Sequence, residues 1–287
     1  MTRHKWLPPV HLHPILIVFI LISFLTGTFI ELMTILAIVL VHELGHYAAA
    51  RWFRWRIRGV MLWVFGGVMD TDEQGTRPFR EEVIVTLAGP AQHLFIYLLL
   101  FVLSGSQIVL PSVIETAYVY NTVILLFNLL PIWPLDGGKL LFLFLSERLP
   151  YRKAYDSIIL FSLWLNVALV LVLLFFVPFT LSAFLLFMFL LMENRNDWKQ
   201  RYYVFMRFLL QRYQGRVHAN QVQPIEVSHR HKLIDVFNCF HRDRAHTVYV
   251  TIPGNSRQSL DEMECLHSYF HERNYRKSIG ELVSHVS

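Results

Sequence analysis

The chain has 287 residues, of which 54% are hydrophobic and 16% are charged, whereas soluble domains average roughly 45–50% and 25%. This composition excludes a single soluble domain. The long apolar runs lie between Ile15 and Met192, and charge gathers in residues 193–287, which predicts a membrane domain followed by a soluble tail. The formal net charge of +5 comes mostly from Arg and Lys beside apolar runs, where cations orient a membrane protein, so we expect no direct nucleic-acid partner.

Six apolar segments are each about long enough to cross a hydrocarbon layer of roughly 30 Å. In chain order these predicted spans are 14–30, 32–52, 83–103, 113–130, 156–176 and 178–192. Lys and Arg precede the first span and follow the second, fourth and sixth, whereas the other three connections contain neither. Because cations collect on the cytosolic side, we expect six crossings with both termini in the cytosol.

Two segments between the spans lack the pattern of a simple helix. Residues 58–70 alternate bulky apolar side chains around a Phe65-Gly66-Gly67 centre, which predicts a strand or a re-entrant hairpin. The segment Asn128–Lys139 carries two prolines and a glycine pair directly after an apolar run. Irregular backbone at membrane depth is tolerated only where it is buried in protein or lines a wet cavity. The second segment therefore predicts an internal site.

The tail is predicted to contain a linker and a small domain. Residues 193–221 are rich in aromatic and basic side chains, which is typical of an interfacial helix. Residues 222–287 have the pattern of a soluble α/β domain, with a helix near 232–241, a strand at 247–252, a turn and a second helix. The predicted fold class is mainly α: a polytopic membrane domain with six transmembrane helices, residues 1–192, and a small C-terminal cytosolic α/β domain.

The cysteines and histidines of the tail have no spacing typical of a metal site. Cys239 and Cys265 are too few for a disulfide framework, and we expect both to be buried thiols in a reducing compartment. The eight histidines of the tail, which include His229 and His231, are predicted to be surface residues.

The strongest chemical signal is His42-Glu43-Leu44-Gly45-His46 inside the second span. On a helix, positions i and i+4 share a face, so both imidazoles can bind one Zn²⁺ while Glu43 acts on the metal-bound water. Two histidines and a glutamate within a membrane are costly unless they meet partners inside the protein. The alternative interpretation is a pair of core histidines whose hydrogen bonds are satisfied. Gln92 and His93 are candidate polar neighbours of the pair, and His93 can equally be an interhelical hydrogen-bond former.

A catalytic zinc with two histidine ligands needs a third protein ligand and an open position. Asp136 is the candidate, because it is the carboxylate of the broken segment and would otherwise be unpaired in the membrane. The prolines before it interrupt the helix, and Gly137-Gly138 allow close backbone approach. The alternative role for Asp136 is to cap a helix that resumes at Gly138. Glu115 and Glu147 are poorer candidates because they lie at the predicted interfaces.

These motifs resemble those of the site-two proteases, zinc metalloproteases that cut within or beside transmembrane segments. The resemblance covers HExxH at His42–His46, the run Asn128-x-x-Pro131-x-x-Pro134-Leu135-Asp136-Gly137, the strand Phe65-Gly66-Gly67 and Ala88-Gly89-Pro90. It implies one Zn²⁺ per chain held by His42, His46 and Asp136, with Glu43 as general base. It also implies that Asn128 holds the substrate main chain. Phe65, Gly66 and Gly67 would offer an edge for strand addition to an extended substrate.

The six spans and cytosolic tail further resemble the branch of this family that cleaves the pro-sequence of a membrane-tethered sigma factor in endospore-forming bacilli. This likeness implies a location in the membrane around the forespore, facing the mother cell, and membrane-bound inhibitory or regulatory partners. The tail is similar to a single CBS module over 227–270. Such a module implies ATP binding or pairing of two chains through the C-terminal domain, and a docking domain without a ligand is the alternative.

Two other functions fit part of the pattern. An ion-coupled transporter or channel also uses a broken helix with an intramembrane Asp and His pair, but it does not require Glu43, and the chain lacks two similar halves. A metal-free pseudoprotease would only bind membrane proteins, and the complete set of ligand types with Glu43 argues against it.

Overall fold

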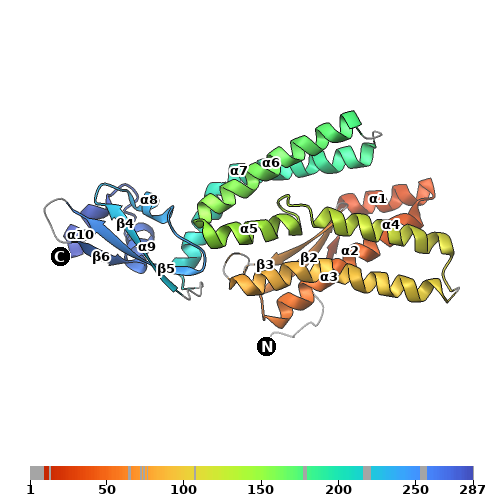
Figure 1. Ribbon diagram of the computed structural model, residues 1–287, viewed down its shortest axis with the longest axis horizontal. Helices are drawn as coiled ribbons and strands as arrows, with labels where there is room; N and C mark the ends of the chain where they lie inside the picture. Colours follow the sequence, from red (N-terminus) through yellow and green to blue (C-terminus); the bar gives the residue numbers. More distant parts are fainter. Residues whose placement is uncertain are drawn as a thin grey trace. The chain divides into compact units, whose positions relative to one another are not determined.

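The computed structural model describes residues 10–12, 14–63, 66–71, 73, 75, 77–106, 108–176, 180–215, 221–252 and 257–286. The chain divides into two compact units. One unit comprises Met1–Gln74 with Arg80–Leu140, and the other comprises Gly75–Phe79 with Leu141–Ser287. Each unit is described by itself below (Figure 1).

The first unit combines helices with a three-stranded sheet. Its helices are α1 (Pro14–Thr26), α2 (Phe29–Trp52), α3 (Phe79–Ser104) and α4 (Pro111–Asn128), and its strands are β1 (Val10–Leu12), β2 (Ile57–Trp63) and β3 (Gly66–Thr71). The strand order is β1-β2-β3, with β1 parallel and β3 antiparallel to β2. The hairpin predicted within residues 58–70 is therefore confirmed, and β3 lies against α2.

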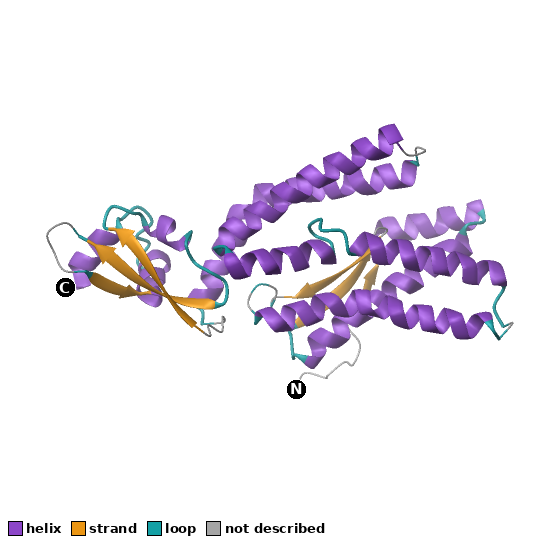
Figure 2. Ribbon diagram, viewed as in Figure 1, coloured by secondary structure: helices purple, strands orange, loops and turns teal. Residues whose placement is uncertain are grey.

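Apolar packing joins α2, α3 and α4. Ile38 of α2, Ile96 and Leu100 of α3 and Ala117 of α4 form one buried cluster. Figure 2 shows these three helices gathered beside the sheet of their unit. Because of this packing, the faces of α2, α3 and α4 that carry buried polar side chains are held toward one another.

The second unit begins with long helices. It contains most of α5 (Asp136–Arg148), then α6 (Tyr151–Phe176) and α7 (Leu181–Tyr213), which pack against each other. The tight turn predicted at 177–178 lies outside the described residues. The chain continues without a break from the predicted sixth span into the predicted interfacial linker, because α7 is a single helix of 33 residues.

Within the described residues after α7 there are six short elements. They are β4 (Gln221–Ser228), α8 (Leu233–Phe237), β5 (Arg244–Thr251), β6 (Gln258–Asp261), α9 (Glu262–Phe270) and α10 (Ile279–Val286). The strands form a sheet of order β4-β5-β6, in which β4 and β5 are parallel and β6 is antiparallel to β5. The α/β character of the tail is confirmed, although the helix expected over 232–241 is limited to five residues.

Three helices among the described residues are long and apolar enough to cross a membrane: α2, α3 and α6. A shorter apolar helix covers Leu16–Thr26. Within the described residues, each of the six predicted spans overlaps a helix, the remaining two helices being α4 and the start of α7. The protein is thus a mainly helical membrane protein, while six crossings stay a prediction.

One tail histidine was predicted to be on the surface and is instead buried. His246 has 1% of its surface exposed, because alternate residues of β5 face the interior of the domain. Its Nδ1 lies 3.0 Å from Glu262 Oε2, and Arg212 at the end of α7 donates to the same carboxylate. Burial lowers the pKa of His246, so its neutral form is favoured. Although burial alone would raise the pKa of Glu262, hydrogen bonds from His246 and Arg212 hold it below its ordinary value.

The two cysteines also differ from each other. Cys265 is buried as predicted, and this burial raises the pKa of its thiol to about 12. Cys239 is exposed, so the prediction that it is buried was wrong. Cys239 lies in the turn after the five-residue helix α8, and not within the longer helix that the sequence predicts over 232–241.

Candidate metal centre

Two imidazoles and a carboxylate converge in the first unit. His42 and His46 lie one turn apart on α2, and their Nε2 atoms are 3.1 Å apart. Asp136, the first residue of α5, places its Oδ2 3.1 Å from each of these nitrogens. All three residues are buried and form a group that can hold a metal ion. The structure thus brings together the three residues that the sequence predicts as ligands.

The hydrogen bonds around His46 favour a cation at this point. Its Nδ1 lies 2.8 Å from the Val85 carbonyl oxygen, and because a carbonyl only accepts, Nδ1 carries the proton. In the neutral ring, Nε2 then presents a lone pair toward Asp136. Zn–N bonds of about 2.0–2.1 Å at tetrahedral angles place ligand atoms about 3.3 Å apart, close to the 3.1 Å separations observed here. The donor set therefore fits zinc.

The second oxygen of Asp136 has its own partner. Lys139 is one turn further along α5, and its Nζ lies 3.2 Å from Asp136 Oδ1. Because one oxygen faces the ammonium group and the other faces the imidazoles, the carboxylate is oriented toward the histidines. The sequence reasoning missed Lys139, although a cation three residues after an intramembrane aspartate is a detectable signal.

The broken segment brings Asp136 to this position. Between the end of α4 at Asn128 and the start of α5, the chain is not helical. A Cβ built on Gly137 would overlap the Leu129 carbonyl, and one on Gly138 would overlap the Ile132 carbonyl. The close backbone approach predicted for the glycine pair is confirmed. Asp136 itself begins the helix that was expected to resume at Gly138.

Glu43 is buried next to the two histidines, and β3 passes directly over it. A Cβ built on Gly67 would overlap Glu43 Cγ and lie 2.8 Å from Glu43 Oε1, closer than real Cβ atoms approach. The glycine therefore leaves room for the carboxylate beside the sheet. This contact places the hairpin at the candidate centre, which the sequence pattern alone does not reveal.

The remaining predicted site residues are placed as follows. Gly66 is the first residue of β3, and its Cα pairs with Trp63. Asn128 ends α4, where its Nδ2 donates to the Ile124 carbonyl at 2.9 Å. Phe65 lies outside the described residues. His93 contacts the centre, since its Nε2 is 3.1 Å from His42 Nδ1, and the prediction of His93 as a polar neighbour is confirmed.

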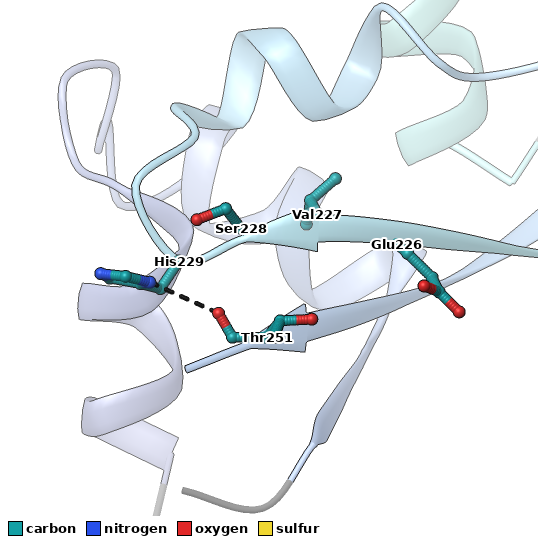
Figure 3. Close-up of a pocket in the computed structure, with 5 residues that line it drawn as sticks. All are labelled: Glu226, Val227, Ser228, His229 and Thr251. Atoms are coloured by element: carbon teal, nitrogen blue, oxygen red, sulfur yellow. Dashed lines mark hydrogen bonds between the residues drawn. The ribbon is translucent and has the colours of Figure 1, made fainter. Parts of the chain in front are cut away.

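A hollow of about 320 Å³ opens at the carboxyl ends of β4 and β5 in the tail (Figure 3). Glu226, Val227, Ser228, His229 and Thr251 line it. The Thr251 carbonyl accepts a hydrogen bond from the His229 main chain at 3.3 Å, and His229 Nδ1 lies 3.4 Å from the same oxygen. The carboxyl ends of parallel strands are a common location for ligands.

Comparison with known proteins finds relatives for both the metal motifs and the whole chain. The family described as Peptidase family M50 matches residues 30–111 and 104–175. The chain is 39% identical over 284 residues to Stage IV sporulation protein FB of Bacillus subtilis, an alignment that covers 98% of this chain and 99% of that protein. It is also 34% identical over 116 residues to a putative zinc metalloprotease of Synechocystis, covering 39% of this chain and 30% of that protein.

The chain shares its fold with the solved structure of the site-2 protease from Methanocaldococcus jannaschii, which aligns with a TM-score of 0.55 and 23% sequence identity. The alignment covers 69% of this chain and 93% of that structure.

Proposed function

The chain belongs to peptidase family M50 and is an intramembrane zinc metalloprotease, and we propose that His42, His46 and Asp136 hold its zinc. The observation that carries this assignment is the convergence of three buried ligand atoms 3.1 Å from one another. The Nδ1–H to Val85 bond and the Lys139 contact leave His46 Nε2 and Asp136 Oδ2 directed at one point.

Glu43 is the proposed general base. A bound zinc supplies a Lewis acid for the scissile carbonyl and lowers the pKa of water to near 7. Glu43 takes the proton from the attacking water and returns it to the leaving amine as the peptide C–N bond breaks. Because Gly67 has no side chain, the Glu43 carboxylate fits directly beside β3. Proton transfer by Glu43 would then take place next to the strand proposed to bind substrate.

We propose that the substrate binds as an added strand along β3. In the order β1-β2-β3, β3 is at the edge of the sheet and also lies against α2. An extended peptide on this edge would have its backbone hydrogen-bonded close to Glu43. Phe65, Gly66 and Gly67 would form the start of that edge, and Asn128 would hold the substrate main chain. A helical substrate must unwind first, because its scissile bond is otherwise in the i to i−4 hydrogen-bond pattern.

The proposed substrate is the pro-sequence of a membrane-tethered sigma factor. The motifs and tail resemble the sporulation branch of the family, and the relative from Bacillus subtilis is named a sporulation protein. We extend the proposal to the location in the membrane around the forespore and to membrane-bound inhibitory partners. Co-purification of membrane-bound partners with the full-length protein from sporulating cells tests the partners and the location. Recovery of the protein from vegetative membranes alone would contradict both.

Metal removal tests the function. The purified full-length protein is expected to cleave a membrane-tethered pro-sigma substrate, to stop after treatment with a zinc chelator and to resume when zinc is returned. Asp136→Ala is expected to lower zinc content and cleavage together, because a two-histidine site loses its third ligand.

Glu115→Ala is the matched control for the metal experiment, because Glu115 is an exposed carboxylate on α4. It should retain both zinc and cleavage. Full activity and zinc content in Asp136→Ala would refute the ligand assignment. Zinc binding without cleavage of any membrane substrate would favour a transporter or a binding protein.

We also propose six crossings with cytosolic termini. The support is the absence of Lys and Arg from alternate connections between the six helical segments. A reporter fused after Ser106 should behave as external and one fused at Arg77 as cytosolic. The reverse pattern would overturn this topology.

For the tail we propose a CBS-like module that binds ATP in the hollow between Ser228 and Thr251 and pairs with a second chain. The support is the position of this hollow at the carboxyl ends of two parallel strands. Titration of the full-length protein with ATP should show saturable binding that Ser228→Tyr removes by filling the hollow. Wild-type protein without saturable binding would leave the tail as a docking domain.

A further inference from the structure

Behind His42, a chain of buried hydrogen bonds crosses three helices. His93 of α3 lies between His42 of α2 and Asn121 of α4, and both His93 and Asn121 have no exposed surface. His93 Nε2 is 3.1 Å from His42 Nδ1, and His93 Nδ1 is 2.7 Å from Asn121 Oδ1. Buried polar groups such as these have strictly defined donor and acceptor roles, because an unmatched one is costly.

The donor and acceptor roles in this series of hydrogen bonds are determined by Asn121, the residue most distant from His42. Asn121 Nδ2 lies 3.2 Å from the His93 carbonyl oxygen, which only accepts, so this atom is the amide nitrogen and donates. The other amide atom, Oδ1, must then accept a hydrogen bond from the Nδ1–H of His93. In neutral His93 this leaves Nε2 as an acceptor, so it accepts a hydrogen bond from the Nδ1–H of His42.

The consequence for His42 is a single ring tautomer. With its proton on Nδ1, His42 presents the Nε2 lone pair toward Asp136 Oδ2, 3.1 Å away. His46 reaches the same state through the Val85 carbonyl. The two histidines are thus oriented by different partners. His46 is held by one main-chain oxygen. His42 is held by two side chains in series, His93 and Asn121, which we call the relay.

We propose that His93 and Asn121 are positioning residues that hold His42 as the Nδ1–H tautomer with its Nε2 lone pair aimed at the metal. This inference rests on the proposed role of His42 as a zinc ligand. Outer partners of metal-binding histidines typically contribute about 10- to 100-fold to metal affinity. The specific feature here is that Asn121 acts only through His93, two hydrogen bonds away from the ligand atom.

Metal affinity of the full-length protein tests the relay without using activity. Asn121→Leu is expected to weaken zinc binding by about 10- to 100-fold, measured by competition with a chelator, and to change the absorption spectrum of bound Co²⁺. Asn121→Asp should keep the wild-type spectrum, because a carboxylate still accepts from His93 Nδ1. In a His93→Leu background, the further change Asn121→Leu should have no additional effect on affinity.

Thr122→Val is the matched control. The Thr122 hydroxyl of α4 is 2.7 Å from Tyr97 Oη of α3. This variant therefore removes a hydrogen bond between the two helices that carry Asn121 and His93, one turn further along α3 and outside the relay. It should bind zinc as wild type does. Equal zinc affinity in Asn121→Leu and wild type, or an equal loss in Thr122→Val, overturns the relay. If wild-type protein binds no zinc, the proposed function fails together with this inference.

Discussion

Replacing Glu43 by Gln will abolish cleavage while zinc stays bound. The amide keeps the size of the side chain beside Gly67 but cannot take a proton from water. Loss of a general base typically lowers the rate by about 10²- to 10⁴-fold. The three ligand atoms of His42, His46 and Asp136 are unchanged by this substitution. The measurement pairs product formation from a membrane-tethered substrate with the zinc content of the same preparation.

Glu31→Gln provides the comparison for Glu43→Gln. Glu31 belongs to the first turn of the same helix and is exposed, whereas Glu43 is buried with 6% of its surface exposed. The Glu31 variant should cleave at the wild-type rate. Wild-type cleavage by Glu43→Gln would remove the general-base assignment, and loss of the folded protein in that variant would show that Glu43 has a structural role.

The sequence predicted the metal ligands because their chemistry has local signals. A helical repeat of 3.6 residues places His42 and His46 on one face without any tertiary information. Asp136 was identifiable since a carboxylate among prolines and glycines at membrane depth needs a partner. Both predictions depend on residue type and spacing, and the three residues do converge in the structure.

The supporting groups could not be predicted in the same way. The contact of Gly67 with Glu43 and the relay through Asn121 join residues that are 24 or more positions apart along the chain. Periodicity does not report which faces of α3 and α4 meet. Asn121, an amide in the middle of an apolar helix, indicates that an interhelical hydrogen bond exists but does not identify its partner.

In the tail, the wrong predictions have local causes. The absence of metal-ligand spacing predicts a surface position for His246, and this prediction is wrong because the alternation of β5 places it inward with Val248 and Val250. Its Nδ1 is paired with Glu262 of α9, whose carboxylate also accepts a hydrogen bond from Arg212 of α7, and its Nε2 accepts one from the main-chain N–H of His241. A buried charge is tolerated where such partners converge, and their convergence is a property of the folded domain.

Gly89→Ala is expected to weaken metal binding although residue 89 provides no ligand. Gly89 on α3 lies directly against the two histidines of α2. A Cβ at this position would overlap His46 Nε2 and Cε1 and lie 2.8 Å from His42 Nε2. The imidazoles cannot move away freely, because Val85 and His93 hold their Nδ1 atoms. Overpacking of a tight interior typically costs 1–3 kcal/mol, which corresponds to about 5- to 150-fold in zinc affinity.

A second glycine separates the contact from the general effect of adding a methyl group. Gly105 follows the last residue of α3, and a Cβ there would meet only the Val102 carbonyl oxygen, at 3.7 Å. Gly105→Ala should therefore bind zinc with wild-type affinity in the same chelator competition. Because the methyl group at residue 89 acts on the ligand nitrogens themselves, its effect should appear in zinc affinity and the Co²⁺ spectrum before any loss of helical content. Wild-type affinity in Gly89→Ala would mean that α2 and α3 separate easily, and that the rigid positioning of His42 and His46 inferred from their Nδ1 partners is wrong.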